Sequence, residues 1–152
     1  MTARPSVSEA ASAIARAAHH GQVDKQGRDY YNAHLAPIAA MLRPFGEHAE
    51  AAGWLHDILE DTNYTAEDLE AEGMPDAVVE AVISVSRLRS EPYTELIARA
   101  AAHPLSRLVK LADNWHNLST IDQLDPATAT RLRAKYTDAR RVLEAALTQE
   151  PR

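Results

Sequence analysis

The pattern of hydrophobic and polar positions contains no valine- or isoleucine-rich stretch that alternates with the period of two typical of a half-buried strand. Alanine, the best helix former, is abundant, and the 152 residues include only 5 glycines. Both features favour helix along nearly the whole chain. The sequence therefore predicts an all-α fold, and a chain of this length is expected to form one domain.

Capping residues predict where helices of the first half begin. Ser6 or Ser8 can cap a helix that runs to about His20. Thr65 and Asp68 have the spacing of a capping box, which would start a short acidic helix. Two further helices are expected near residues 31–43 and 47–60.

Prolines predict the helix starts of the second half, because a proline at the first helical position loses no hydrogen bond through its missing N–H. Four prolines stand at such positions: Pro75, Pro92, Pro104 and Pro126. The last helix is expected from about Ala127 to Leu147, followed by a polar tail that should fray. The stretch from Gly21 to Asp29 has two glycines, mixed charges and no apolar stripe, so we expect it to be a loop.

Charge and cysteine content limit the possible functions. With 16 Lys and Arg against 22 Asp and Glu, the net charge is −6, so the chain lacks the basic excess that nucleic-acid and anionic-membrane binding rely on. An anionic substrate then needs a local device such as a metal ion. The absence of cysteine excludes disulfides and thiolate sites and fits a reducing compartment. Because no window approaches the roughly 18 apolar residues of a spanning helix, we expect a cytoplasmic protein with no membrane or nucleic-acid partner.

One segment with the pattern of a buried helix end also carries four polar residues: His56, Asp57, Glu60 and Asp61. At helical spacing His56 and Glu60 share one face, and Asp57 and Asp61 share the neighbouring one. Clustered carboxylates raise each other's pKa unless a cation neutralises them, so a metal bound by His and Asp is one interpretation. A solvated acidic helix end beside a buried histidine is the other.

A second polar cluster favours the metal interpretation. Asp113 and Asn117 lie four residues apart in an otherwise apolar helix, with Lys110 one turn earlier. Burying a lone carboxylate costs several kcal/mol, so Asp113 is expected to pair with a metal or a base. His34 lies in a third helix beside the apolar Leu35 and is a further candidate ligand. A histidine that only fills the core would show the same pattern.

These residues occur in the order found in the HD superfamily. The shared motifs are His20-Gly21-Gln22 with Lys25 and Gly27, then Tyr31 and His34, then His56-Asp57-x-x-Glu60-Asp61-Thr62, and finally Lys110-Leu-Ala-Asp113-x-x-His116-Asn117. They span about residues 15–121 and resemble the RelA/SpoT-type guanosine polyphosphate 3′-pyrophosphohydrolases and their small stand-alone relatives. The resemblance implies a bundle of about seven to nine helices, in a single HD hydrolase domain over residues 1–152 with a core near 6–147.

The resemblance also implies which residues carry the chemistry. One divalent ion, manganese in this family, would be bound by His34, His56, Asp57 and Asp113. Glu60 and Asp61 would be the catalytic acids that position or deprotonate the attacking water. The nucleotide would contact Lys25, Tyr31, Asn117 and Thr120, with Tyr93 and Arg87 at the rim of its pocket. The implied reaction removes the 3′-pyrophosphate of guanosine tetra- or pentaphosphate (ppGpp or pppGpp), the nucleotides of the stringent response.

The early loop departs from the family pattern. Asp24 stands where many relatives carry a base-stacking cation, and at an effective dielectric near 20 a charge about 4 Å from a phosphate costs on the order of 4 kcal/mol. Asp24 is therefore expected to turn away from the phosphates, to pair with Lys25 or Arg28, or to accept hydrogen bonds from the guanine edge. The spacing before His34 is slightly longer than usual, which leaves Tyr30 as an alternative to Tyr31.

Three other functions stay open. An HD phosphohydrolase for another nucleotide, or for a phosphorylated dinucleotide, is favoured by the altered loop. A nucleotide sensor without turnover is opposed by the presence of all four ligands and both acids. A di-iron HD oxygenase needs extra His and Asp ligands between the two main motifs, and the sequence offers no convincing set. Because the chain stops soon after the HD core, we expect hydrolysis without synthesis; the sequence does not indicate the oligomeric state.

Overall fold

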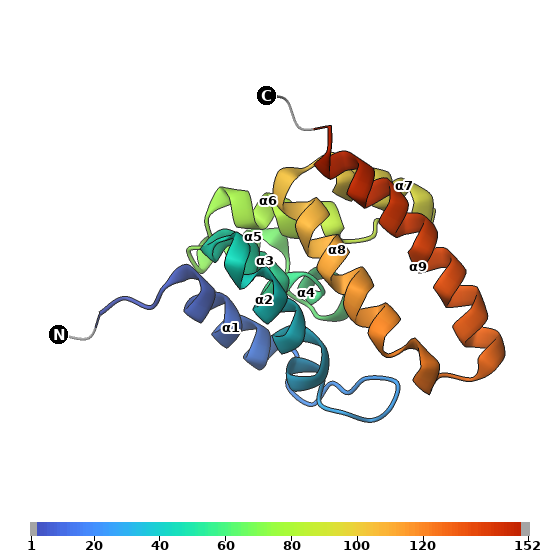
Figure 1. Cartoon of the computed structure of the whole chain (residues 1–152). Helices are drawn as coiled ribbons and strands as arrows, with labels where there is room; N and C mark the ends of the chain where they lie inside the picture. The colour runs from blue at the N-terminus through green and yellow to red at the C-terminus, as the bar shows by residue number, and fades with distance from the viewer. Residues whose placement is uncertain (1–2, 150–152) are drawn as a thin grey trace.

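The computed structural model describes residues 3–149, and this part of the chain folds into nine α-helices (Figure 1). The helices are α1 (Val7–Ala18), α2 (Ala36–Leu42), α3 (Glu47–Leu55), α4 (Ile58–Asp61), α5 (Ala66–Ala71), α6 (Asp76–Val85), α7 (Tyr93–Ala101), α8 (Pro104–Ser119) and α9 (Pro126–Leu147). The all-α prediction is confirmed. Within the described residues the only β-type pairing is an isolated bridge between Val23 and Asp29. The tail expected to fray continues into residues 150–152, which lie outside the described part.

The predicted capping box at Thr65 is present, and the predicted cap of the first helix is a capping box as well. The Ser6 side chain accepts a hydrogen bond from the Glu9 N–H, and the Glu9 carboxylate accepts one from the Ser6 N–H, so Ser6 rather than Ser8 caps α1. Thr65 and Asp68 exchange the same two bonds at the start of α5. Each box satisfies backbone donors that a helix N-terminus leaves without a partner inside the helix.

The prolines mark the second-half helices with a small correction. Pro104 and Pro126 are the first residues of α8 and α9, as predicted. Pro75 and Pro92 instead stand one residue before α6 and α7, with ψ near 148° and 145°. That extended backbone places them at the cap, where their carbonyl groups accept the first hydrogen bonds of each helix.

Two predicted helices are not continuous. The segment near 31–43 begins with a wider π-type turn over Tyr31–Leu35 and ends in a 3-10 turn over Arg43–Phe45. The segment near 47–60 is broken, because Asp57 adopts φ −101° and ψ 0° and so separates α3 from α4. Both irregular backbones occur next to predicted metal ligands, so the irregularities shape the site directly.

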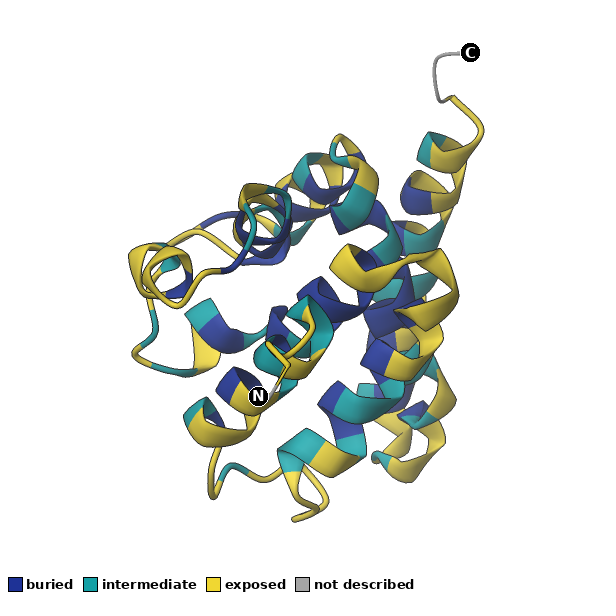
Figure 2. Ribbon diagram, turned by 90° about the vertical axis from the view of Figure 1, so that its left-hand side faces the viewer, coloured by how far each residue is buried: buried dark blue, intermediate teal, exposed yellow. Residues whose placement is uncertain are grey.

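Helix α3 forms the middle of the bundle and packs against α1, α2, α6 and α8. Figure 2 shows the buried residues on the faces that the helices turn toward one another, with exposed residues outside. A Cβ atom at Gly53 would lie 2.6 Å from Leu42 Cδ1 and 3.3 Å from Ala39 Cα, so glycine allows α2 to approach α3 closely. This close contact brings the start of α2 beside the end of α3.

The last helix is attached to the bundle by its own apolar contacts. Ile121, Ala129 and Leu132 are buried together at the connection between α8 and α9, with Tyr136 packed against them. From there α9 runs along α8 and α7 (Figure 1). The predicted loop from Gly21 to Asp29 is confirmed between α1 and the π-type turn. Among the described residues, no helix has the length and apolar character needed to cross a membrane.

Candidate active site

Four predicted ligand side chains meet inside the bundle. His34 Nε2 lies 3.2 Å from His56 Nε2 and 3.2 Å from Asp57 Oδ2. Asp113 Oδ1, from α8, lies 3.3 Å from His34 Nε2 and 3.6 Å from His56 Nε2. The four side chains come from the π-type turn, the α3–α4 break and α8, so residues far apart in the sequence build one cluster.

The backbone breaks direct the ligand atoms. His56 is the last residue associated with α3, and its Nδ1 lies 2.7 Å from the Gly53 carbonyl oxygen. A carbonyl oxygen only accepts hydrogen bonds, so His56 Nδ1 is the donor, and Nε2 is the ring nitrogen that faces the cluster. The backbone departs from helical geometry at Asp57. As a result, the Asp57 carboxylate also faces the cluster, with Oδ2 3.0 Å from His56 Nε2.

The cluster is strongly coupled electrostatically. Burial opposes charge on the His56 ring, but the carboxylates of Asp57 and Asp113 raise its pKa well above the usual value. Burial likewise opposes ionisation of Asp57, yet the His56 charge holds the pKa of this carboxyl well below its usual range. Two imidazole Nε2 atoms and two ionised carboxylates converging at these distances form the donor set of a borderline divalent cation. The residues present therefore fit a metal ion.

Neighbouring side chains orient each ligand. The Tyr30 hydroxyl donates to Asp57 Oδ2. Lys110 Nζ pairs with Asp113 Oδ2 at 3.2 Å, and Asn117 Nδ2 donates to Asp113 Oδ1 at 3.3 Å. Such outer partners fix the orientation of metal ligands and are nearly as important as the ligands themselves.

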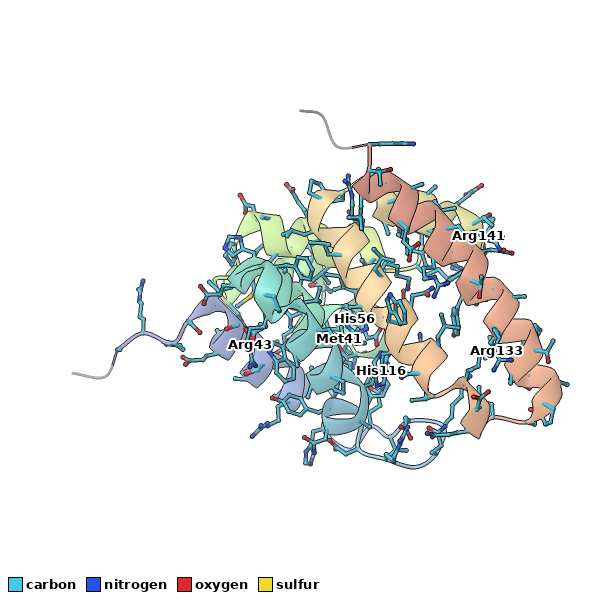
Figure 3. All side chains as sticks on the ribbon, in the orientation of Figure 1. Met41, Arg43, His56, His116, Arg133 and Arg141 are labelled. Atoms are coloured by element: carbon cyan, nitrogen blue, oxygen red, sulfur yellow. The ribbon has the colours of Figure 1, made fainter. Side chains whose placement is uncertain are left out.

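His116 contacts the cluster from the side. Its Nδ1 lies 3.2 Å from His34 Nδ1, and Figure 3 shows His56 and His116 in the middle of the molecule between α2 and α8. Burial and the neighbouring His34 lower the pKa of His116, so the neutral ring can accept the His34 Nδ1 proton. His116 thus has the position of an orienting residue rather than of a ligand.

The two predicted catalytic acids point to different partners. Glu60 Oε1 accepts a hydrogen bond from the main-chain N–H of Arg87, and Asp61 Oδ2 accepts one from Gln22 Nε2 at 3.0 Å. The prediction that His56 and Glu60 share the face of one helix is wrong, because α3 ends before His56. Burial raises the pKa of both acids, and the Asp57 charge adds to this effect. A carboxyl group with a raised pKa is suited to proton transfer near neutral pH.

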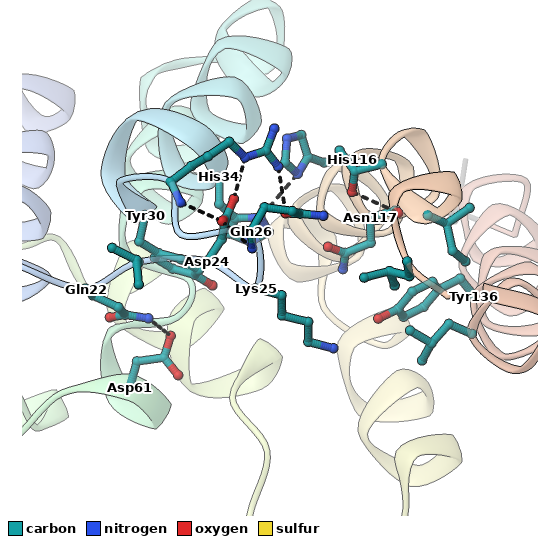
Figure 4. A pocket seen from close by; sticks show the side chains of 16 residues that line it. Gln22, Asp24, Lys25, Gln26, Tyr30, His34, Asp61, His116, Asn117 and Tyr136 are labelled. Atoms are coloured by element: carbon teal, nitrogen blue, oxygen red, sulfur yellow. Dashed lines mark hydrogen bonds and ion pairs between the residues drawn. The ribbon is translucent and has the colours of Figure 1, made fainter. Parts of the chain in front are cut away.

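Gln22 is itself held in place. His19 Nδ1 lies 2.7 Å from Gln22 Oε1, which leaves the Gln22 amide nitrogen to donate to Asp61. Gln22 belongs to the His20-Gly21-Gln22 motif, but its contact with Asp61 was not predicted. Figure 4 shows Gln22 and Asp61 at the edge of the cavity beside the loop.

Two cavities meet at the cluster. The first, of about 330 Å³, is enclosed by the early loop, the end of α8 and the start of α9 (Figure 4). The second, of about 210 Å³, lies between Glu60, Lys110 and α9. Residues common to both walls are Tyr30, His34, Asn117 and Tyr136. The shared walls make the two cavities neighbouring parts of one cleft, in which His34 lines both cavities and Asp57 and Asp113 line the second.

Three of the four predicted substrate contacts line the first cavity: Lys25, Asn117 and Thr120. Tyr31 does not, because its ring stacks on Trp54 at 4.8 Å between centroids. Tyr30, the alternative left by the spacing, takes the position beside the ligands.

The two rim predictions differ in outcome. Tyr93 lines the second cavity. Arg87 lines neither, since its guanidinium Nε donates to the Glu91 carbonyl at 2.8 Å and its main-chain N–H contacts Glu60. Arg87 therefore acts on the site through its backbone.

Asp24 is occupied within its own loop. Its carboxylate accepts hydrogen bonds from the Gln26 N–H and the Arg28 N–H, each at 2.9 Å, and from Arg28 Nε at 2.8 Å. Although desolvation acts in the opposite direction, the bonds from Arg28 lower the pKa of Asp24. Of the three expected arrangements, the structure shows pairing with Arg28.

Comparisons with known proteins place this arrangement among its relatives. No family model matches the chain. The probable guanosine-3′,5′-bis(diphosphate) 3′-pyrophosphohydrolase of Synechocystis sp. is 31% identical over 131 residues, covering 78% of this chain and 17% of that protein. The guanosine-3′,5′-bis(diphosphate) 3′-pyrophosphohydrolase of Haemophilus influenzae is 33% identical over 132 residues, covering 78% of this chain and 19% of that protein. Over this part, the chain is similar in sequence to guanosine-3′,5′-bis(diphosphate) 3′-pyrophosphohydrolases.

A solved structure shares the fold of this chain. A metazoan ortholog of SpoT, described as hydrolysing ppGpp, superposes with a TM-score of 0.73 and 23% identity over 98% of both chains. The resemblance predicted from the motifs is thus confirmed by the sequence similarity to the curated relatives, and the solved structure shares the fold. The chain spans less than a fifth of the length of the two curated relatives, at 17% and 19%.

Proposed function

We propose that this chain is a metal-dependent phosphohydrolase that removes the 3′-pyrophosphate of ppGpp or pppGpp. The observation that carries the proposal is the convergence of two imidazole nitrogens and two carboxylates beside two adjoining cavities. Such a donor set is typical of an ion that assists hydrolysis of phosphate esters. The names of the relatives point to the same nucleotides.

The divalent ion would be held by His34, His56, Asp57 and Asp113. We propose manganese because the resemblance to the RelA/SpoT-type hydrolases implies it, and the carboxylate ligands are compatible with it. When bound, such an ion supplies positive charge beside the phosphate and activates water for hydrolysis. Tyr30 contributes by holding the Asp57 carboxylate through its hydroxyl. The ligand geometry is thereby fixed before substrate arrives.

Glu60 is the proposed general acid or base. It lines the same cavity as Asp57 and Asp113, and the Arg87 N–H fixes one of its oxygens while the other stays available. A carboxyl group in this position contributes roughly 10²- to 10⁴-fold by transferring a proton to or from the reacting water or leaving oxygen. Asp61, held by Gln22, is proposed to orient the water from the opposite side.

The first cavity has the walls expected for a nucleoside. Ile121, Leu124 and Leu132 give it an apolar side for a base, and Lys25 extends into it from the loop (Figure 4). Asn117 and Thr120 lie where a sugar would connect the base to the ligand cluster. This order supports the proposal, because base, ribose and 3′-phosphates would follow one another along the cleft as the proposed reaction requires.

Incubation of the purified protein with ppGpp and manganese tests the function. We expect GDP and pyrophosphate in equal amounts, and no reaction after treatment with EDTA. Efficient cleavage of another nucleotide or a phosphorylated dinucleotide, with ppGpp left intact, would replace this proposal by the more general HD phosphohydrolase. Tight nucleotide binding without turnover of any of these would instead support a sensor. The cytoplasmic location stays a prediction that rests on the absence of cysteine.

Asp24→Ala tests the role of the acidic residue that stands in the early loop where many relatives carry a cation. Because Asp24 is bonded to Arg28 and Gln26, its loss should loosen the loop and raise KM for ppGpp and for the adenosine analogue by a similar factor, on the order of two to five. KM for both substrates is measured in parallel with wild type. A selective loss of the guanosine substrate would mean that Asp24 reads the base, and improved binding of both would mean that it repels phosphate.

A further inference from the structure

The second cavity contains a lysine that the proposed mechanism does not use. Lys135, on α9, lines this cavity together with Lys110. Lys110 is already paired with Asp113 at 3.2 Å. Lys135 instead places its ammonium group 4.1 Å from the centre of the Tyr93 ring, and among residues 3–149 no carboxylate forms an ion pair with it.

The surroundings of Lys135 favour an anionic ligand. Burial lowers the pKa of Lys135, and nearby positive charges lower it further; these come from Arg87, Lys110, Arg131 and Lys25. Burial also raises the pKa of Tyr93 to about 12, so the ring beside Lys135 carries no compensating charge near neutral pH. A partly buried cation among other cations attracts a phosphate, because none of the described carboxylates forms an ion pair with it.

The position of Lys135 identifies which part of a substrate it meets. The cavity that it lines also contains Asp57, Asp113 and Glu60, whereas the apolar wall suited to a base belongs to the other cavity. A nucleotide with its first 3′-phosphate at the ligand cluster would extend its next phosphate into the second cavity. Lys135 lies on the α9 wall of that cavity, which this second phosphate would face.

We propose that Lys135 binds the terminal phosphate of the 3′-pyrophosphate and makes the site selective for a pyrophosphoryl group over a single phosphate. The inference rests on the proposed function for the orientation of the nucleotide. In the reaction, a water oxygen bonds to the phosphorus next to the ribose 3′-oxygen, and the bond between that phosphorus and the 3′-oxygen breaks. The ribose oxygen takes up a proton, and the phosphate held by Lys135 leaves within inorganic pyrophosphate.

Binding of inorganic pyrophosphate and orthophosphate to the manganese-loaded protein tests this role. We expect Lys135→Gln to weaken pyrophosphate binding at least about tenfold, the usual effect of losing a charge-assisted hydrogen bond. Orthophosphate, which needs only the ligand cluster, should bind as in wild type. Lys135→Arg should retain most of the pyrophosphate affinity. Arg141→Gln removes an equal charge from an exposed position on the same helix and should leave both affinities unchanged.

Kinetics with paired substrates complete the test. Lys135→Gln should raise KM about tenfold for a nucleotide with a 3′-pyrophosphate and leave KM unchanged for the same nucleotide with a 3′-monophosphate. Equal weakening of orthophosphate and pyrophosphate, or an effect that follows the number of 5′-phosphates, would overturn the assignment. If the wild type binds pyrophosphate through Lys135 but does not cleave ppGpp, the inference stands and the proposed function falls.

Discussion

Replacing Asp113 with alanine is expected to remove bound manganese and hydrolytic activity together. Asp113 supplies the oxygen that lies 3.3 Å from His34 Nε2 and 3.6 Å from His56 Nε2, and it is the one proposed ligand from α8. Its loss leaves a ligand set from only two neighbouring segments. We expect activity to fall more than about a hundredfold, since loss of an outer partner alone costs 10- to 100-fold.

The same substitution leaves Lys110 buried without its partner, which is strongly destabilising in a low-dielectric environment. A second variant separates this effect from loss of the metal. Asp113→Ala combined with Lys110→Met removes the buried charge as well, so the melting temperature should recover while the metal site stays absent. Metal content after gel filtration and thermal unfolding are measured for both variants. If either variant retains stoichiometric manganese, Asp113 is not a ligand.

The residue types of the site could be predicted from the sequence, because each is chemically unusual in its place. Asp113 is a carboxylate in an apolar helix, and His56 is a histidine next to an acid. Such groups need a polar partner when they are buried, whatever the tertiary fold. The starts of the helices could also be predicted from the sequence, because Ser6 and Thr65 cap their helices through contacts within one turn. Local chemistry thus predicted both the elements and the candidate ligands.

The errors come from places where tertiary packing overrides the regular helix. A continuous helix near 47–60 satisfies local propensity, but the break at Asp57 brings its carboxylate to His34. The π-type turn likewise shifts the register before His34, so Tyr30 and not Tyr31 faces the ligands. A helical repeat assumed to be uniform cannot predict either change.

Lys135 could not be singled out from the sequence, because a lysine on an amphipathic helix is usually a solvated surface residue. Its position depends on the apolar cluster around Ile121 and Leu132, which fixes the start of α9 against the end of α8. Only this packing brings the lysine to the cavity that contains Glu60. Long-range contacts of this kind determine which side chains line the second cavity.

Glu60→Gln is expected to leave the metal bound while lowering turnover by about two orders of magnitude or more. Glutamine keeps the shape of the side chain and can still accept the Arg87 N–H through its amide oxygen, so the position of the side chain is retained. What it loses is the proton that the carboxyl group transfers. Metal content and kcat with saturating ppGpp are compared with wild type, and Glu67→Gln, on α5, serves as the matched control.

The pH profile of the Glu60→Gln variant distinguishes the two roles of the carboxyl group. Burial raises the pKa of Glu60, so a general base loses activity as the pH falls through this raised value. A general acid loses activity as the pH rises through it. Whichever limb of the wild-type profile belongs to Glu60 should be absent from the variant. Full turnover with metal bound and an unchanged profile would remove Glu60 from the mechanism and leave Asp61 as the remaining candidate for proton transfer.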